Sequence, residues 1–241
     1  MEKEIENIFS YAVALDQAGK QKNTILCRNR EIFMINFDKT ILLHFDLPKS
    51  CFAFNEDIIF DANDYDSSNF YIEDHSIIFK TVQDGYIRKK KCGTNKTVNL
   101  NDISELYRSY TEKEITSNFV LRREINNLLQ DDLSHIEIHY DKGLKVIQRD
   151  IFSGTIIEIT KDKSGLNLAA NTDNLSPFNP IGLRTIDLEA LFNYDREISF
   201  SFVEDLNYFV IKGKTTGMQG ILAWCLYDEL GRINVIGENE P

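Results

Sequence analysis

The chain has 241 residues, 42% of them hydrophobic, so it can bury one large core or two of ordinary size and is not a disordered chain. A formal net charge of −11 excludes a protein that is basic overall, as most nucleic-acid binders are, but basic residues still gather locally, as in residues 88–91. Four isolated cysteines, an acidic start and the lack of a long apolar run predict a soluble, cytoplasmic protein with no membrane contact.

The first half is predicted to begin with an amphipathic helix. Its apolar positions follow helical spacing and stop near Gly19 (Ile5, Ile8, Phe9, Ala12 and Val13). Alternating residues in 24–46 predict two or three strands, and residues 55–66 have the length of a second helix, although Asn and Asp crowd them. Strands recur at 70–72 and 77–79, where the Asp84-Gly85 turn predicts a hairpin returning through Tyr86.

The middle of the chain is predicted to connect two halves. Residues 89–117 are rich in Lys, Asn, Thr and Glu, with a short helix expected around Ile103. Thr116 or Ser117 could then cap a helix with an inward apolar stripe (Val120, Leu121, Ile125, Leu128 and Leu129). Strands are expected at 136–140, 144–148 and 155–160, followed by a loop with Pro177 and Pro180, a short helix at 186–193, and strands at 197–203, 208–212 and 219–227.

The two halves also match each other in order. Residues 4–9 resemble 124–129, 24–27 resemble 135–138, 39–42 resemble 154–157, and 70–74 resemble 200–205. Each matched segment is short and mostly apolar, so chance similarity between two helices or two strands is the alternative. A duplicated domain explains four matches in the same order, and self-similarity of this kind decides the architecture before any single element does.

The order of elements in each half, helix, several strands, short helix and further strands, resembles that of the DNA sliding clamps. The segments that carry the resemblance best are Ile186–Phe192, Ile198–Phe202, Phe209–Gly213 and Gly220–Leu226. The nearest similarity is to the processivity factors of tailed phages and to the eukaryotic and archaeal proliferating-cell clamp. It implies an α+β fold of two similar tandem domains, each with helices on one face of antiparallel sheet, with clamp domains at 1–90 and 118–241 and an interdomain connector at 91–117.

The resemblance further implies a phage or bacterial homotrimeric ring that encircles double-stranded DNA without sequence specificity. Such a ring tethers a DNA polymerase, is opened by a clamp loader, and is neither an enzyme nor dependent on a cofactor or metal. Mobile cations on the helices would face the phosphates, and the candidates are Lys3, Lys20, Lys22, Arg122, Arg123 and Arg184. Acidic residues at the start of the first helix and in 55–66 do not fit this role. Leu106, Tyr107 and Tyr110 could line a pocket for partner peptides, or could be core residues of the connector helix.

Other side chains leave two alternatives open, a duplicated protein-interaction module that never binds DNA and a metal-dependent enzyme. His135, Glu137 and His139 alternate on a predicted strand and would share one face, where they could bind zinc or be plain polar surface. His44, Asp46, Asp74 and His75 offer acid–base chemistry only if the fold brings such groups together. The basic run 88–91 could be a solvated strand end, touch DNA at the rim of the hole, or contact an acidic surface of a neighbouring subunit.

Overall fold

The computed structural model divides the chain into two compact units, Met1–Ser109 and Tyr110–Pro241. It describes residues 2–14, 23–36, 39–65, 69–74, 76–92, 99–113, 115–129, 135–140, 144–149, 153–160, 169–170, 178–203, 208–223, 225–227 and 233–234. None of the described helices is both long enough and apolar enough to cross a bilayer.

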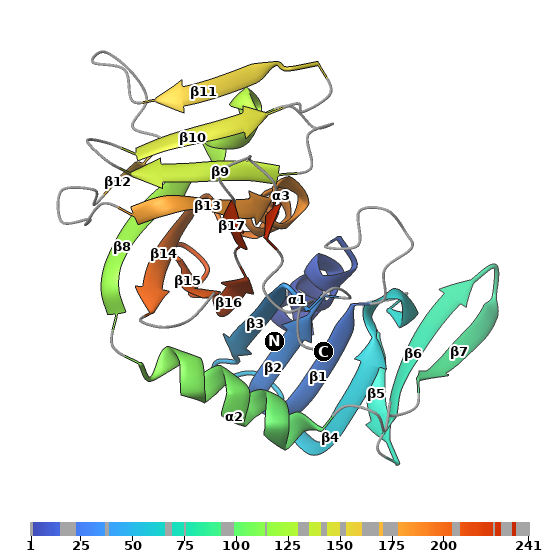
Figure 1. The fold of residues 1–241 in the computed structure, drawn as a ribbon. Helices are drawn as coiled ribbons and strands as arrows, with labels where there is room; N and C mark the ends of the chain where they lie inside the picture. The colour runs from blue at the N-terminus through green and yellow to red at the C-terminus, as the bar shows by residue number, and fades with distance from the viewer. Residues whose placement is uncertain are drawn as a thin grey trace, which may run out of the picture. The chain divides into compact units, whose positions relative to one another are not determined.

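Unit 1 consists of antiparallel strands with one long helix before them and one after (Figure 1). Its elements are α1 (Glu2–Ala14), β1 (Thr24–Asn29), β2 (Glu31–Ile35), β3 (Ile41–Asp46), β4 (Phe54–Asp61), the 3₁₀ helix η1 (Ala62–Asp64), β5 (Phe70–Glu73), β6 (Ser76–Gln83), β7 (Tyr86–Cys92) and α2 (Leu100–Thr111), which runs across the boundary. The strands are hydrogen-bonded in the orders β3-β2-β1-β4 and β5-β6-β7.

Unit 2 repeats this plan with additions. Its elements are β8 (Ile115–Arg122), the 3₁₀ helix η2 (Arg123–Leu128), β9 (His135–Tyr140), β10 (Leu144–Arg149), β11 (Ile156–Thr160), β12 (Ala169–Ala170), β13 (Phe178–Arg184), α3 (Thr185–Tyr194), β14 (Glu197–Val203), β15 (Tyr208–Gly213), β16 (Gln219–Ala223), β17 (Cys225–Tyr227) and β18 (Ile233–Asn234). The strand orders are β11-β10-β9-β13-β17-β18 and β12-β8-β14-β15-β16.

The predicted duplication is confirmed by topology. The elements of unit 1 have counterparts in unit 2 in the same order: α1 corresponds to η2, strands β1 to β4 correspond to β9, β10, β11 and β13, η1 corresponds to α3, and β5 to β7 correspond to β14 to β16. The strand order β3-β2-β1-β4 is reproduced as β11-β10-β9-β13. All four sequence matches fall on equivalent elements: α1 with η2, β1 with β9, β3 with β11, and β5 with β14. Among the described strands the units differ at two edges. β8 pairs with β14 whereas β5 ends its sheet, and β17 pairs with β13 whereas β4 ends its sheet.

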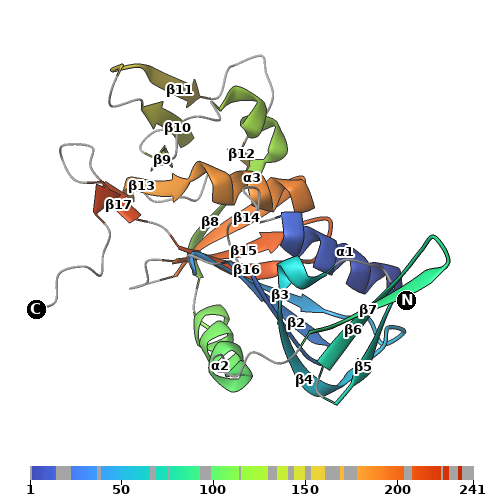
Figure 2. The same cartoon turned by 90° about the vertical axis from the view of Figure 1, so that its right-hand side faces the viewer.

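Aromatic side chains fill the core of each unit. In unit 1, α1 lies against the sheet (Figure 2), and the ring of its Phe9 meets that of Phe60 edge to face at 5.2 Å between centroids. In unit 2, Phe119 of β8 stacks on Phe200 of β14 at 5.3 Å, and Phe209 closes on Phe200 edge to face at 5.6 Å. Such aromatic pairs each contribute about 0.5–1.5 kcal/mol beyond the area they bury. Aromatic contacts thus join α1 to its sheet in unit 1 and neighbouring strands to one another in unit 2.

Most predicted elements are confirmed, including α1, the connector helix α2, α3 and the hairpin between β6 and β7. Asp84 and Gly85 of that hairpin have φ values of 51° and 78°, as a two-residue turn of the primed type requires. Four predictions are wrong among the described residues. Residues 55–64 lie in strand β4 and η1 rather than in a helix, and residues 118–128 form the end of β8 and η2 rather than an α-helix. Pro180 lies in β13 rather than in a loop, and the single strand expected at 219–227 is replaced by β16 and β17, which belong to different sheets.

Candidate nucleic-acid interface and partner site

The exposed surface of α1 carries charges of both signs. Lys3 and Glu4 are both exposed and Glu6 is half-buried, while Ile5 and Phe9 point into the core. The predicted DNA-facing residues Lys20 and Lys22 lie outside the described residues. The structure thus places one predicted cation, Lys3, on the exposed side of the first helix, next to an acid.

Arg122 and Arg123 lie at the junction of β8 and η2, so neither sits on the polar face of an α-helix as the sequence predicted. The Arg122 Nε donates to Glu197 Oε1 at 2.9 Å, and the backbone register places these two residues directly opposite each other. Arg123 is exposed, and its backbone N–H donates to the carbonyl of Arg196. Of the pair, Arg123 presents its charge to solvent while the charge of Arg122 is shared with a carboxylate.

Arg184 ends β13 immediately before α3. Its Nε lies 3.7 Å from a carboxylate oxygen of Asp187 in the first turn of that helix. Burial lowers the pKa of the His135 imidazole, and the nearby positive charge of the Arg184 guanidinium lowers it further. Arg184 therefore stands beside a helix, as predicted, but partly neutralised.

The three residues of the predicted peptide pocket have different surroundings. Leu106 is exposed on α2, whereas Tyr107 is buried, with its ring 5.8 Å from that of Phe33 and 4.6 Å from that of His44. Burial, and then the charges of Asp46 and Glu31, raise the pKa of Tyr107 to about 12. In unit 2, Tyr110 contacts the ring of Tyr208 at 5.2 Å. Tyr107 thus joins α2 to the face of the β2–β3 sheet, and Leu106 remains available at the surface.

Of the group His135, Glu137 and His139, the last two form a hydrogen-bonded network with Arg149. The buried carboxylate of Glu137 contacts His139 Nε2 at 2.8 Å and accepts from Arg149 Nε at 2.6 Å, so both of its oxygens have partners. An arginine in this position repels a metal cation. Within the described part of the chain, a different group, Glu31, His44 and Asp46, has the spacing of a metal site. The sequence analysis named His44 and Asp46, with Asp74 and His75, for acid–base chemistry rather than for metal binding, and it missed Glu31. His75 lies outside the described residues.

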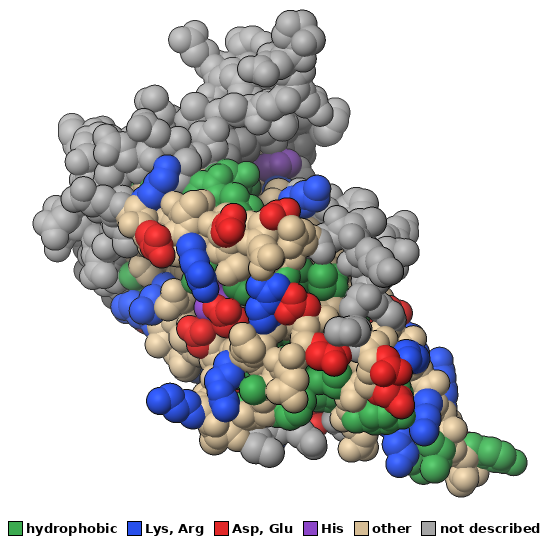
Figure 3. Space-filling model, turned by 90° about the horizontal axis from the view of Figure 1, so that it is seen from below, with side chains coloured by type: hydrophobic (Ala, Val, Ile, Leu, Met, Phe, Trp, Pro, Cys, Tyr) green, Lys and Arg blue, Asp and Glu red, His purple; other side chains and the backbone are tan. Residues whose placement is uncertain are grey.

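The hairpin of β6 and β7 ends in an exposed apolar tip, visible at the lower right of Figure 3 with Lys and Arg beside it. Val82, Tyr86 and Ile87 expose 64%, 79% and 60% of their surface. Behind the tip, Lys89 lies over the ring of Tyr71 at 5.8 Å and Lys90 pairs with Asp64 at 3.2 Å. An exposed apolar edge strand of this kind marks an interaction surface.

No family model and no curated protein matches the chain. Solved structures do. A chain described as a DNA polymerase III beta subunit from Eubacterium rectale aligns with 90% of this chain at a TM-score of 0.55 and 10% identity. A chain of the PCNA2–PCNA3 complex from Sulfolobus tokodaii aligns with 90% at a TM-score of 0.54 and 13% identity, and the Helicobacter pylori beta clamp bound to a DNA ligase peptide aligns with 84% at 0.54 and 13%.

The chain has the DNA sliding-clamp fold. It spans 63% of the Eubacterium rectale chain and 56% of the Helicobacter pylori clamp, but 95% of the Sulfolobus tokodaii chain. The predicted fold class is confirmed, since this clamp fold is built here from two units with the same strand order and helices on the sheets.

Proposed function

We propose that the protein is a DNA polymerase sliding clamp, a non-catalytic ring that encircles duplex DNA and tethers replication proteins. The observation that carries the proposal is the duplicated unit, because two copies with the same strand order occur in a chain whose fold is that of clamps. In this reading residues 1–90 and 118–241 are the two clamp domains and residues 91–117, with α2, are the connector.

The helices α1, η2 and α3 with their flanking residues would face the DNA. A ring needs no base readout, since it stays linked to the duplex by topology, and weak contacts from mobile cations to phosphates suffice. Lys3 and Arg123 are exposed for this purpose, and Arg122 and Arg184 would share their charge between phosphates and their carboxylate partners. Lys20 and Lys22 complete the set proposed for DNA contact.

The ring would close by a head-to-tail contact between copies of the chain. Among the described strands, β7 ends one sheet of unit 1 and β11 ends one sheet of unit 2. Both edges expose apolar residues, Ile87 on β7 and Ile156 on β11, while β7 is basic and β11 carries the exposed acid Glu158. A heterologous contact of this kind generates a ring when its rotation closes, and the proposal is a ring of three.

Partner proteins would bind as extended peptides beside α2. Peptide binding is supported by the similar Helicobacter pylori clamp, whose structure holds a DNA ligase peptide. Leu106 offers an exposed apolar contact there, with Tyr107 anchoring the helix beneath it and Tyr110 following one turn later. The proposed partners are a DNA polymerase and a clamp loader.

Two measurements test the proposal. Light scattering coupled to size-exclusion chromatography should give a mass of three chains, and a strict monomer at high concentration contradicts the ring. Protein loaded on nicked circular DNA should stay bound through a spin column and be lost after the circle is cut. Equal retention on circular and linear DNA would show that no topological link exists.

A protein-interaction module that never binds DNA is the second candidate. It is favoured by the net charge of −11 and by Glu4 and Glu6 on α1, which oppose phosphate contact. An oligomer that binds polymerase peptides but is not retained on circular DNA, even with a loader, would decide for this candidate.

A further inference from the structure

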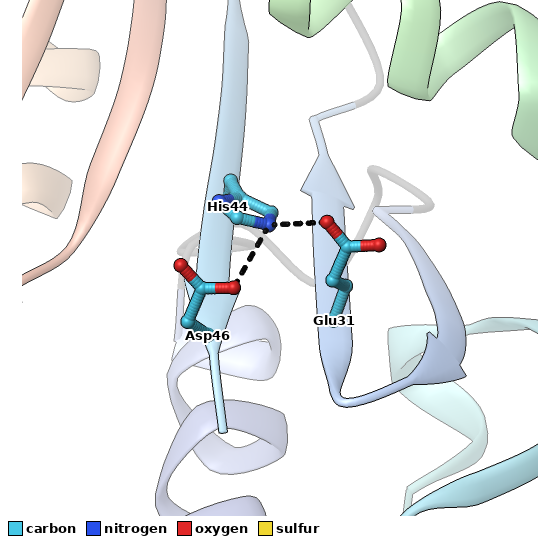
Figure 4. Close-up of side chains that lie close together, drawn as sticks. All are labelled: Glu31, His44 and Asp46. Carbon is cyan, nitrogen blue, oxygen red and sulfur yellow. Dashed lines mark hydrogen bonds and ion pairs between the residues drawn. The ribbon is translucent and has the colours of Figure 1, made fainter. Parts of the chain in front are cut away.

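Three potential metal ligands meet on the β2–β3 hairpin. The register pairs Glu31 with Asp46 directly across the two strands, and His44 lies two residues before Asp46, so all three side chains leave the same face. The His44 Nε2 lies 3.3 Å from Glu31 Oε1 and 3.7 Å from Asp46 Oδ1 (Figure 4). The ligand atoms of all three lie within 4.8 Å of one another. Strands thus fix the group on a rigid part of unit 1.

The imidazole is held in place by aromatic neighbours. His44 exposes only 7% of its surface and lies against two rings, with centroids 4.7 Å from Phe33 and 4.6 Å from Tyr107. These contacts leave Nε2 directed at the two carboxylates, as Figure 4 shows. An imidazole nitrogen turned towards two carboxylate oxygens offers the donor set of a site for a borderline metal ion.

The two carboxylates also create a local excess of negative charge. Like charges directly opposite on neighbouring strands destabilise a sheet. The hydrogen bond with Asp57 and, less strongly, the nearby charge of Glu31 raise the pKa of Arg28, but its guanidinium forms a two-pronged pair with Asp57 and donates to Asn101. A cation between Glu31 and Asp46 would remove the repulsion.

We propose that Glu31, His44 and Asp46 bind a divalent first-row transition-metal ion of the zinc class. His44 Nε2 and one oxygen from each carboxylate are the protein ligands, and water completes the coordination. A small closure of the side chains brings the donors to the usual distances of about 2.0–2.2 Å. Asp46 and Glu31 are exposed enough to rotate inward, and three protein ligands leave the site open to exchange. The proposal stands independently of whether the protein encircles DNA.

The test is metal binding by the full chain after treatment with EDTA and dialysis. Calorimetry with Zn²⁺ should show one saturable site per chain, and Co²⁺ should give visible absorption without the near-ultraviolet bands of thiolate ligation. Asp46→Asn and Glu31→Gln should each weaken Zn²⁺ binding by at least about tenfold. Mutating a residue that only supports a ligand already lowers metal affinity by about that factor, and removing the ligand itself should lower it at least as much. His44→Gln should abolish it.

A matched control is available in the same chain. His139→Gln removes another imidazole that contacts a carboxylate, that of Glu137, which also accepts from Arg149, and this change should leave Zn²⁺ affinity unchanged. Nitrogen-15 spectra of the four histidines identify the ligand, because Zn²⁺ should shift His44 Nε2 selectively. The proposal is overturned if Zn²⁺ gives no saturable binding, if Asp46→Asn binds as the wild type does, or if His44 stays a doubly protonated bridge between the carboxylates at neutral pH in excess Zn²⁺. Since Asp46 is exposed, its variant stays folded and interpretable even if His44→Gln does not.

Discussion

Asp195 offers a sharp test of how unit 2 is held together. It follows α3, and its backbone N–H donates to the carbonyl of Leu191 at the end of that helix. Its Oδ2 accepts from the backbone N–H of Thr215 at 2.9 Å and of Thr216 at 2.8 Å, and from the Thr216 hydroxyl at 2.9 Å. Its Oδ1 accepts from the N–H of Glu197 at 3.0 Å. One carboxylate thus ties the end of α3, the start of β14 and the β15–β16 turn together.

Asp195→Asn keeps the shape of the side chain but replaces one acceptor oxygen with an NH₂ group. If the remaining oxygen faces Thr215 and Thr216, the NH₂ group meets the N–H of Glu197, and two donors oppose each other in a buried position. The other three hydrogen bonds also lose their charged acceptor. Together these changes should lower the free energy of unfolding by roughly 2–4 kcal/mol. Asp74→Asn is the control, because Asp74 is exposed and has φ 49°, a conformation that Asn also adopts readily.

The measurement is urea unfolding followed by the fluorescence of Trp224, the only tryptophan, which belongs to unit 2. Burial alone would raise the pKa of Asp195, but the hydrogen bonds from Glu197, Thr216 and Thr215 outweigh it and lower the pKa. A lowered pKa in the folded state means that the stabilisation is complete above the unfolded value of about 3.9 and is lost as the pH falls through the folded value. The difference between wild type and Asp195→Asn should therefore be constant near neutrality and shrink below about pH 4.

Gly213→Ala approaches the same carboxylate from the other side. A Cβ on Gly213 would lie 2.5 Å from Asp195 Oδ2 and 2.9 Å from Thr216 Oγ1, and the hydrogen bonds prevent these oxygens from moving away. The expected loss is about 1–3 kcal/mol, typical of overpacking. A stability of Asp195→Asn equal to that of Asp74→Asn at neutral pH would refute the reasoning, as would a difference that grows towards pH 3.

Two further predictions address the proposed ring. Arg123→Glu should shorten retention on circular DNA without changing the urea midpoint. Lys212→Glu, a change at another exposed residue on strand β15, should leave retention unaltered. Equal effects of both changes would point to net charge rather than to a DNA-facing position of Arg123. Ile87→Asp at the edge of β7 should turn the oligomer into a monomer on light scattering, while Leu128→Asp, also exposed but on η2, should not. An oligomer that survives Ile87→Asp would exclude β7 from the contact between copies.

Residue patterns predicted most of the elements, including strand β3, in which every residue from Ile41 to Phe45 is buried. They failed at two other strands with continuous buried runs. Ile58, Ile59 and Phe60 are all buried, as are Phe119, Val120 and Leu121, so neither strand alternates. A continuous apolar run of this kind is equally compatible with a strand and with part of a helix. The strand assignment then depends on pairing with segments far away in the chain, β1 for the first run and β14 for the second.

The candidate sites show the same division between local and distant information. The pairing of Arg122 with Glu197 follows from the register of β8 on β14, which no local pattern encodes. The proximity of Glu31 to His44 could have been predicted, because Ile35 opposite Leu42 at the hairpin turn fixes every later pair of β2 and β3. Counting back from that turn places Glu31 opposite Asp46. Contacts within a hairpin are thus readable once its turn is located, and contacts between non-adjacent strands are not.

The duplication also explains how a clamp could tolerate so acidic a chain. The matched segments keep the buried positions, such as Phe9 in α1 and Leu129 after η2, because the sheet beneath them must be covered. The exposed positions diverge, but in both helices a cation stands next to an acid, Lys3 beside Glu4 and Arg123 beside Glu124. Such surfaces are close to neutral and release few counterions on meeting DNA, so binding through them should depend only weakly on salt. A ring can accept this weakness, because topology rather than affinity keeps it on the duplex, whereas an open binder with the same surface could not remain bound.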